Sequence, residues 1–388
     1  MRDRGHAGSQ EQAEVPGATT LRGALIGCGR IAIRHVQAWD AIDGAGLVAV
    51  CDTDPYRAQS VAASAGVTAW YSSAAQMLEE LGPDLDFLDI ATPAPAHRGL
   101  TQAGFGRGLH VLCQKPMADS GRDTLALVEL AGRTELVFAV NEIWKWIPAY
   151  QRVAEILRSG ALGQVHAARF SCTANLLLPI AEDLAVASQD SVSAESAAVL
   201  RARLATFGLL DHLVVMEQGV HVLDIMRSWF GEPSALRCFA SRLSPALRGP
   251  DDAAFIRLRY ETFFADIVLD WARPGSPAGD LTAGESFAVR GDAGVLSVSA
   301  ARRVEWHRSG RPPERETYDG DIRARAFAGS HGDFIRAITR RRLPASSAED
   351  NARTQSMAFA CYASAASDGQ WIENPTEWLQ STAGTAGG

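Results

Sequence analysis

The sequence predicts an α/β protein in which a doubly wound parallel sheet is followed by an α+β domain with a mostly antiparallel sheet. At 388 residues the chain is longer than one core of roughly 250 to 300 residues can serve, so two domains are expected. Short apolar runs alternate with helix-like stretches from Leu21 onward, which indicates stacked βαβ units. After Asn141 the runs alternate between apolar and polar residues, as strands of an antiparallel sheet do.

The first half contains short strand candidates separated by helical segments. These strands are apolar because helices are expected to cover both faces of a parallel sheet. The predicted strands are Gly23–Ile26, Leu47–Cys51, Phe87–Ala91, His110–Cys113 and Val137–Val140. The predicted helices, which carry Ala and Leu at helical spacing, are Ile31–Ala41, Tyr56–Ala65, Ala74–Leu81, His97–Gly106 and Asp123–Arg133.

The second half begins with a predicted helix, Pro148–Ser159, which ends at Gly160. The predicted strands that follow are Val165–Thr173, Ser234–Arg242, Ala254–Tyr260 and Phe264–Trp271. The chain therefore divides into a disordered tail (1–20), a doubly wound domain (21–140), an α+β domain (141–374) and a second tail (375–388). The segment Leu178–Phe207 interrupts the second domain and is either a lid or a surface insertion.

The composition is that of an average globular enzyme, with 47% apolar and 21% charged residues. A net charge of -8 opposes binding to nucleic acid, and the short cluster Arg340–Arg342 is expected to be a solvated helix end. The sequence contains neither a signal peptide nor a run near the roughly twenty apolar residues of a membrane span, so a cytoplasmic location is expected. The six cysteines lack CxxC spacing and are expected to be reduced and structural.

A glycine-rich turn, Gly27-Cys28-Gly29-Arg30-Ile31-Ala32, follows the first predicted strand and opens a helix. In such a G-x-G-x-x-A motif the glycines permit a tight turn and the approach of a pyrophosphate, and the small last residue lets the helix pack on the strand. Asp52 ends the second strand, where a carboxylate accepts hydrogen bonds from an adenosine ribose. Asp52 and Asp54 would repel a 2'-phosphate, so NAD is favoured over NADP. Arg57 lies nearby, in what is expected to be the exposed first turn of a helix.

Gln114-Lys115-Pro116 stands at the carboxyl end of the predicted strand His110–Cys113. Doubly wound folds bind their ligands at this edge of the sheet. A lysine buried there beside a cationic nicotinamide would share a proton with a substrate hydroxyl. The spacing leaves a simple surface lysine as an equal alternative.

A second group of ionisable residues lies in an apolar stretch that is predicted to be helical. Glu217, His221 and Asp224 are four and then three residues apart and would share one helix face. Such a stripe should face a polar cavity or a partner charge, because burying it alone costs on the order of several kcal/mol. Gly219 indicates that something approaches the backbone closely. The stripe is an acid–base group, a core network or a metal site; metal is the least favoured reading, and no ligand is assigned.

Together these residues resemble the Gfo/Idh/MocA family of glucose-fructose oxidoreductases and inositol dehydrogenases. The similarity extends from Leu21 to about Asn374. Its further markers are Thr92-Pro93 with His97, the turn Ser159-Gly160-Ala161-Leu162-Gly163, and Gly219-x-His221-x-x-Asp224. The resemblance implies a Rossmann domain that binds NAD, followed by a large open-faced sheet through which the chain forms a homodimer or homotetramer.

The resemblance also implies roles for single residues. Lys115 matches the lysine of the EKP signature, which contacts the nicotinamide and the reacting hydroxyl, and His221 matches the acid–base histidine, which Glu217 would orient. Gln114 departs from the usual Glu, and Glu217 departs from an Asp that many dehydrogenases have, so substrate choice is open to change. Thr92 and Pro93 would flank the nicotinamide ring.

The candidate residues form three sets. The cofactor set is Gly27, Cys28, Gly29, Arg30, Ile31, Asp52, Thr92, Pro93, His97, Gln114 and Lys115. The catalytic set is Lys115, Glu217, His221 and Asp224. The substrate set is Lys115, Glu217, His221, Asn175, Trp144, Lys145 and Trp146, of which the last three either form a wall of the site or pack in the core.

The expected activity is the transfer of a hydride between NAD and a hydroxyl-bearing carbon of a sugar, cyclitol or sugar derivative, with Lys115 and His221 as the acid–base pair. A redox-assisted glycosidase of the same superfamily and a non-catalytic NAD-binding protein are the alternatives. Neither a nucleic acid nor a membrane is an expected partner.

Overall fold

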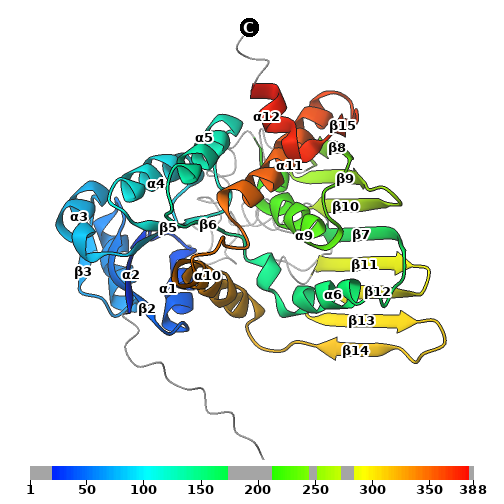
Figure 1. Cartoon of the computed structure of the whole chain (residues 1–388), viewed down its shortest axis with the longest axis horizontal. Coiled ribbons are helices and arrows are strands. Elements are labelled where there is room, and N and C mark those ends of the chain that lie inside the picture. Colours follow the sequence, from blue (N-terminus) through cyan, green and yellow to red (C-terminus); the bar gives the residue numbers. More distant parts are fainter. Residues whose placement is uncertain (1–19, 174–211, 244–250, 272–283, 384–388) are drawn as a thin grey trace, which may run out of the picture.

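The computed structural model describes residues 20–173, 212–243, 251–271 and 284–383 (Figure 1). The predicted insertion Leu178–Phe207 and the candidate substrate contact Asn175 lie outside these residues. Two sheets form the two sides of the molecule, the first built from the blue and cyan part of the chain and the second from the green and yellow part (Figure 1).

Six strands of the described residues form the first sheet, in the order β3-β2-β1-β4-β5-β6. Their bounds are β1 (Leu21–Ile26), β2 (Ala45–Cys51), β3 (Ala69–Tyr71), β4 (Phe87–Ile90), β5 (His110–Gln114) and β6 (Phe138–Asn141). Neighbouring strands all pair in parallel, and the order is that of a Rossmann fold, so the predicted doubly wound domain is confirmed. The sequence does not predict β3, because three residues at a sheet edge carry too short a pattern.

Five helices connect these strands, and their bounds closely match the predicted ones. They are α1 (Ala32–Asp40), α2 (Pro55–Ser64), α3 (Ala74–Leu81), α4 (His97–Phe105) and α5 (Gly121–Gly132). Side-chain oxygens that accept first-turn N–H groups fix three of the starts: Asp54 caps α2, Ser73 caps α3 and Ser120 caps α5.

Nine strands of the described residues form the second sheet, in the order β14-β13-β12-β11-β7-β10-β9-β8-β15. Their bounds are β7 (Val165–Thr173), β8 (Ala235–Ser241), β9 (Ala253–Arg259), β10 (Phe264–Asp270), β11 (Glu285–Gly291), β12 (Gly294–Ser299), β13 (Arg303–Arg308), β14 (Glu314–Thr317) and β15 (Ile372–Glu373). Within the described part of this second sheet, β7 and β10 pair in parallel and the other neighbours pair antiparallel, which confirms a mostly antiparallel sheet. The sequence prediction finds β7 to β10 but not β11 to β15.

Three helices cover one face of the second sheet: α6 (Pro148–Arg158), α9 (Val220–Phe230) and α11 (Ala348–Ala366) (Figure 1). Strand residues alternate between this core and the opposite face. In β7, Phe170 and Cys172 are buried under the helices, whereas Ala167 and Arg169 are exposed on the other side. In the described part of the chain that outer face is open, as the resemblance implies (Figure 1).

The helix α10 (Ile322–Arg340) follows the second sheet in the sequence but packs on the first. Its Phe334 lies in one buried apolar cluster with Trp39 of α1, Phe87 of β4 and Leu112 of β5. The division at residue 140 is therefore too simple, because the chain returns to complete the Rossmann core. Arg341, with φ of 49°, ends α10, so the basic cluster is a helix end as predicted.

The predicted second tail is also incorrect. Residues Trp378–Ala383 form the helix α12, and Leu379 is only 6% exposed because its side chain packs over Gly121 at the start of α5. All six cysteines are buried and free, in agreement with a structural role. Among the helices that the structure describes, none is both long and apolar enough to cross a membrane.

Candidate active site

The glycine-rich turn joins β1 to α1. Gly27 has φ of +103°, and a Cβ on it would lie 2.6 Å from the backbone oxygen of Ala91, so no other residue fits without strain. At Gly29, by contrast, no described atom lies within 4 Å of the position of a Cβ, so the backbone is open to a ligand. Ala32 is fully buried and lets α1 pack closely on the sheet. These are the features that a pyrophosphate at a helix N-terminus requires.

Of the remaining residues of the turn, Cys28 and Ile31 pack against the core and Arg30 is exposed. Cys28 is 5% exposed, and burial raises the pKa of its thiol to about 12. Ile31 packs against the apolar cluster of α1 and β2. Arg30 is exposed and free to reach toward the second domain.

Asp52 lies beside this turn, at the end of β2. Its carboxylate accepts hydrogen bonds from the backbone N–H groups of Cys28 (2.7 Å) and Asp54 (2.9 Å), which fix its orientation. Each oxygen keeps a further lone pair for a ribose hydroxyl. Arg57 is exposed and its Nε lies 3.3 Å from the Asp54 carboxylate, so it is the surface residue that the sequence predicts.

Buried polar groups without partners lie at the carboxyl edge of the first sheet. Within the described residues, the hydroxyl of Thr92 after β4 and the side-chain amide of Asn141 at the end of β6 have no hydrogen-bond partner. Such groups rarely stay unsatisfied, so this edge fits a polar ligand such as a nicotinamide carboxamide. Pro93 is exposed beside Thr92. The sequence prediction misses Asn141.

His97 lies beneath this edge and is fully buried. Its ring nitrogens are 2.8 Å from the carbonyl oxygen of Thr92 and 3.2 Å from that of Met117. Burial lowers the pKa of His97. The structure leaves His97 no surface for direct contact with a cofactor, which corrects the prediction; instead it ties the loops after β4 and β5 together.

Lys115 reaches across the junction between the two domains. Its Nζ donates to the carboxylate of Glu217 and to the backbone oxygen of the same residue, both at 2.9 Å. The Gln114 side chain accepts a hydrogen bond from the backbone N–H of Lys115 (2.8 Å), and its amide nitrogen lies 3.3 Å from Nε2 of His35. An amide suits this position because it donates to one group and accepts from the other.

A π-helical turn, Val215–Gly219, precedes α9 and interrupts the regular helix that the sequence predicts. Turns of this kind are frequent at functional sites. Gly219 is closely packed, because a Cβ on it would lie 3.0 Å from the Val215 side chain, which would have to shift by a few tenths of an ångström. The exposed fraction of the side chain falls along the stripe, from 35% for Glu217 to 12% for His221 and 0% for Asp224.

Glu217 connects the separate parts of the site. Burial alone would raise the pKa of its carboxyl, but the charges of Lys115, His221 and Arg30 lower it. These groups therefore lie close enough to interact. Three groups from separate segments thus act on one carboxylate: the lysine after β5, the histidine of α9 and the arginine of the glycine turn.

The immediate partner of His221 is Glu142 and not the predicted Glu217. The Glu142 carboxylate is fully buried and accepts a hydrogen bond from Nδ1 of His221. Trp144, from the 3₁₀ turn Trp144–Trp146, stacks on the imidazole with ring centroids 5.1 Å apart and planes 7° apart. Sequence reasoning misses Glu142, although a carboxylate directly after β6 was a signal available to it.

Asp224 and Lys145 form a structural pair. The carboxylate of Asp224 is 0% exposed, and Nζ of Lys145 lies 3.1 Å from it and 2.7 Å from Asp350. Trp146 packs against Gly329 of α10. The Asp224 side chain is fully buried, so its position does not support a catalytic role. Lys145 and Trp146 are partly exposed, and a contact of either with substrate stays a prediction.

One His/Asp cluster of the described residues has the geometry to hold a metal ion: His35, Asp89 and His331. All three are fully buried. The Asp89 carboxylate already accepts from Nε1 of Trp39 (2.7 Å) and contacts Nδ1 of His35 (2.8 Å). Oδ1 of Asp89 and Nε2 of His331 have no hydrogen-bond partner among the described residues, and Nε2 lies 3.5 Å from Oδ2 of Asp89. The cluster joins α10 to the first sheet.

The Rossmann sheet, its open glycine turn, Asp52 after β2 and Lys115 at the carboxyl edge of the sheet define the class of protein, a two-domain NAD-dependent oxidoreductase. Residues 21–142 match the family described as "Oxidoreductase family, NAD-binding Rossmann fold", and residues 196–297 match the GFO/IDH/MocA C-terminal domain. The chain belongs to the GFO/IDH/MocA family, and its cofactor is NAD.

Individual relatives support this assignment. D-apiose dehydrogenase of Paraburkholderia graminis is 33% identical over 302 residues, which cover 76% of this chain and 74% of that protein. Inositol 2-dehydrogenase of Acidothermus cellulolyticus is 26% identical over 342 residues, 85% of this chain and 88% of that protein. A crystal structure of an oxidoreductase from Agrobacterium radiobacter, in complex with NAD+, L-tartaric acid and magnesium, shares the fold with a TM-score of 0.78 at 24% identity, over 92% of this chain and 99% of that one.

Proposed function

We propose that this protein oxidises a hydroxyl-bearing carbon of a sugar or cyclitol, or reduces the corresponding carbonyl, with NAD. The observation that carries the proposal is the ion pair of Lys115 with Glu217 across the domain junction, four residues before His221 in the chain and within the electrostatic influence of Arg30 of the glycine turn. An ammonium and an imidazole near one point are the groups that a hydroxyl needs to lose its proton as the carbon loses a hydride.

When bound, NAD supplies the nicotinamide carbon that accepts the hydride from the substrate carbon. His221 accepts the hydroxyl proton at the same time. Lys115 donates a hydrogen bond to the substrate oxygen and stabilises the negative charge that develops there. Glu217 orients the ammonium of Lys115 and balances its charge. Reduction of a carbonyl follows the same steps in reverse.

The substrate class follows from the relatives, whose names are those of a sugar dehydrogenase and a cyclitol dehydrogenase. A panel of pentoses, hexoses, inositols and sugar derivatives, followed by nicotinamide absorbance in both directions, tests it. We expect turnover with at least one polyol or its oxidised form. Turnover with none of them would favour a non-catalytic NAD-binding protein.

Lys115→Ala is the sharpest single test of the mechanism. We expect NAD binding to remain close to that of the wild type, because the glycine turn and Asp52 are untouched. Turnover should fall by about 100-fold or more, as for other residues that act on the reacting group. Unchanged turnover would remove Lys115 from the mechanism. Release of a free sugar from a glycoside, with no net change in nicotinamide absorbance, would instead identify a redox-assisted glycosidase.

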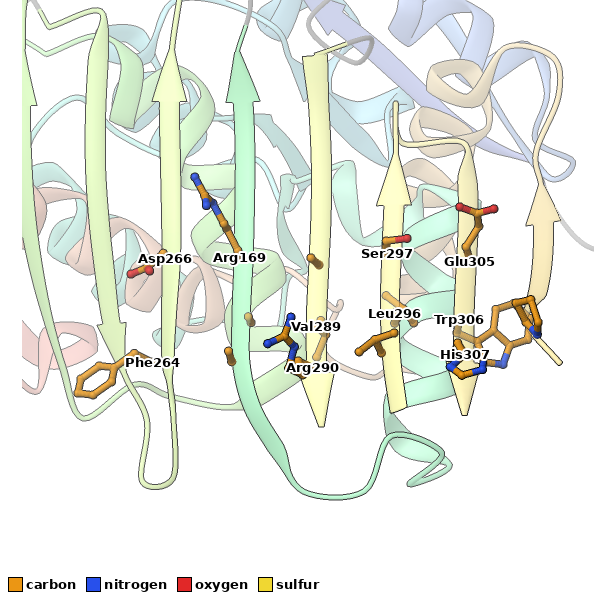
Figure 2. Close-up of a pocket in the computed structure, with 15 residues that line it drawn as sticks. Arg169, Phe264, Asp266, Val289, Arg290, Leu296, Ser297, Glu305, Trp306 and His307 are labelled. Carbon is orange, nitrogen blue, oxygen red and sulfur yellow. The ribbon is translucent and has the colours of Figure 1, made fainter. Parts of the chain in front are cut away.

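We also propose that the open face of the second sheet pairs copies of the chain as a homodimer or homotetramer. A hollow of about 640 Å³ lies on this face, and Phe264, Arg169, Arg290 and His307 are among its exposed lining residues (Figure 2). Phe239 and Phe255 are also exposed, at 46% and 36%. Apolar side chains on an open sheet indicate a protein contact. Phe255→Arg with Phe264→Arg should dissociate the oligomer in light scattering, and a monomeric wild type would contradict the proposal.

A further inference from the structure

Glu142 is the first residue after β6, and it meets a histidine from the other domain. The contact joins its carboxylate to Nδ1 of His221, 79 residues away in the sequence. Because a carboxylate only accepts, the proton of the contact belongs to Nδ1. A neutral imidazole with a proton on Nδ1 has its lone pair on Nε2, and that nitrogen is then the basic one.

Trp144 fixes the plane of the same imidazole. The two rings are stacked at 5.1 Å, and Trp144 itself is held between Tyr150 (5.6 Å) and Phe170 (5.8 Å) in the core of the second domain. Glu142 therefore sets the rotation of the ring within its plane, and Trp144 sets the plane.

Among the described residues, no cationic side chain other than His221 contacts the Glu142 carboxylate. Its Oε1 contacts His221 and lies 3.5 Å from the backbone nitrogen of Trp144, while its Oε2 has no hydrogen-bond partner there. A buried carboxylate in this condition gains most from a positive charge on its neighbour. The charge that His221 acquires when it takes a proton supplies that partner.

Glu217 does not compete for this role, because Lys115 engages it at 2.9 Å. The other charged groups near the imidazole are Lys115 itself, through Glu217, and Asp224 one turn along α9, which Lys145 pairs. The two carboxylates thus have different partners: Glu217 pairs with the ammonium of Lys115, and Glu142 contacts the imidazole of His221.

We propose that Glu142 is a positioning residue that keeps the proton of His221 on Nδ1, so that Nε2 acts as the base toward the substrate hydroxyl. The proposal rests on the proposed function of His221. It extends that function because it assigns the orientation of the base to a residue from the Rossmann side of the junction, outside the α9 stripe.

The first test reads the tautomer without any substrate. In long-range ¹H–¹⁵N spectra of the NAD complex, assigned among nine histidines with His221→Gln, the neutral ring should carry its proton on Nδ1. In Glu142→Leu, which removes the acceptor, we expect the proton to move to Nε2. A proton that stays on Nδ1 in this variant would overturn the proposal. This measurement needs no substrate, so its outcome is independent of whether the proposed function is correct.

The second test is kinetic. Glu142→Gln keeps the shape and removes the charge, and we expect kcat to fall by about 100-fold. Glu142→Asp, which retains the charge at a greater distance, should recover part of the rate. NAD binding should be unchanged in Glu142→Leu, Glu142→Gln and Glu142→Asp.

The matched control is Glu285→Gln. Glu285 is also a buried carboxylate, 3% exposed, and accepts a hydrogen bond from the Tyr150 hydroxyl at 2.9 Å, an interaction that an amide oxygen retains. We expect wild-type kcat in this variant. If Glu142→Gln behaves like this control, Glu142 has only a structural role and the proposal is wrong.

Discussion

The ammonium group of Lys145 lies 3.1 Å from the fully buried carboxylate of Asp224. Asp350 accepts from the same ammonium at 2.7 Å, and its other oxygen lies 3.2 Å from the guanidinium of Arg227. These charges join the segment after β6 to α9 and α11. Asp224, the last residue of the family motif, therefore stabilises the fold. It contributes to the site only by fixing the position of α9.

Lys145→Met should destabilise the protein strongly. The substitution leaves Asp224 buried without its principal cation, and breaking a buried pair in this way costs about 3 to 5 kcal/mol. Urea unfolding of the NAD-free protein measures the loss. Arg133→Met is the control, because the exposed pair of Arg133 with Glu129 on α5 should be worth less than about 1 kcal/mol. Equal losses in the two variants would contradict the assigned role of Lys145.

The pH dependence of Lys145→Met follows from Asp224. Burial raises the pKa of this carboxyl, and Lys145 opposes the shift in the wild type. A raised pKa means that the folded state binds the proton more tightly than the unfolded state, so stability is lost as pH rises through the folded value. The variant should therefore lose less stability at about pH 5 than at about pH 8. Adding Asp224→Asn should abolish this difference.

Gly27→Ala and Gly29→Ala should change different properties, although both residues lie in one turn: the first should lower stability and the second should lower NAD affinity. A Cβ at Gly27 would meet the backbone of Ala91 at 2.6 Å, so the first variant should lose about 2 to 4 kcal/mol of stability. A Cβ at Gly29 meets no described atom within 4 Å, so that variant should fold normally but bind NAD more weakly. Thermal unfolding and NAD fluorescence titration separate the two. Normal NAD affinity in Gly29→Ala would place the pyrophosphate elsewhere.

Asp52→Ser should shift the preference between cofactors. The wild type is expected to prefer NAD, because Asp52 would repel the 2'-phosphate of NADP. Removing this charge should raise the ratio of NADP to NAD affinity by at least about tenfold, which corresponds to about 1.4 kcal/mol. Asp40→Ser, at the exposed end of α1, should leave the ratio unchanged. Tighter binding of NADP by the wild type would overturn the assigned preference.

Gln114→Glu tests the departure from the family signature. Nδ1 of His35 donates to Asp89 at 2.8 Å, so its Nε2 accepts a hydrogen bond from the Gln114 amide. A carboxylate in place of the amide would put two hydrogen-bond acceptors in contact. We expect a loss of about 1 to 3 kcal/mol at neutral pH in thermal unfolding. The exposed Gln37→Glu on α1 is the control and should change little. A stability equal to that of the wild type would contradict the assigned hydrogen bond from the Gln114 amide to Nε2 of His35.

Local sequence determined the first domain and the identity of its main functional residues. The glycine turn, the strand ends and most helix bounds depend on turn geometry, capping and hydrophobic period, which act over a few residues. Asp52 and Lys115 are recognisable for the same reason, since each follows an apolar strand at the edge where ligands bind.

Only the tertiary structure decided how the ionisable groups are paired. Lys115 meets Glu217 across 102 residues, and Glu142 meets His221 across 79. Helical spacing placed Glu217, His221 and Asp224 on one face, but the π-helical turn and the depth of α9 give each a different partner and a different exposure. Partnership and burial arise from packing between distant segments, and no local pattern encodes which carboxylate reaches which cation.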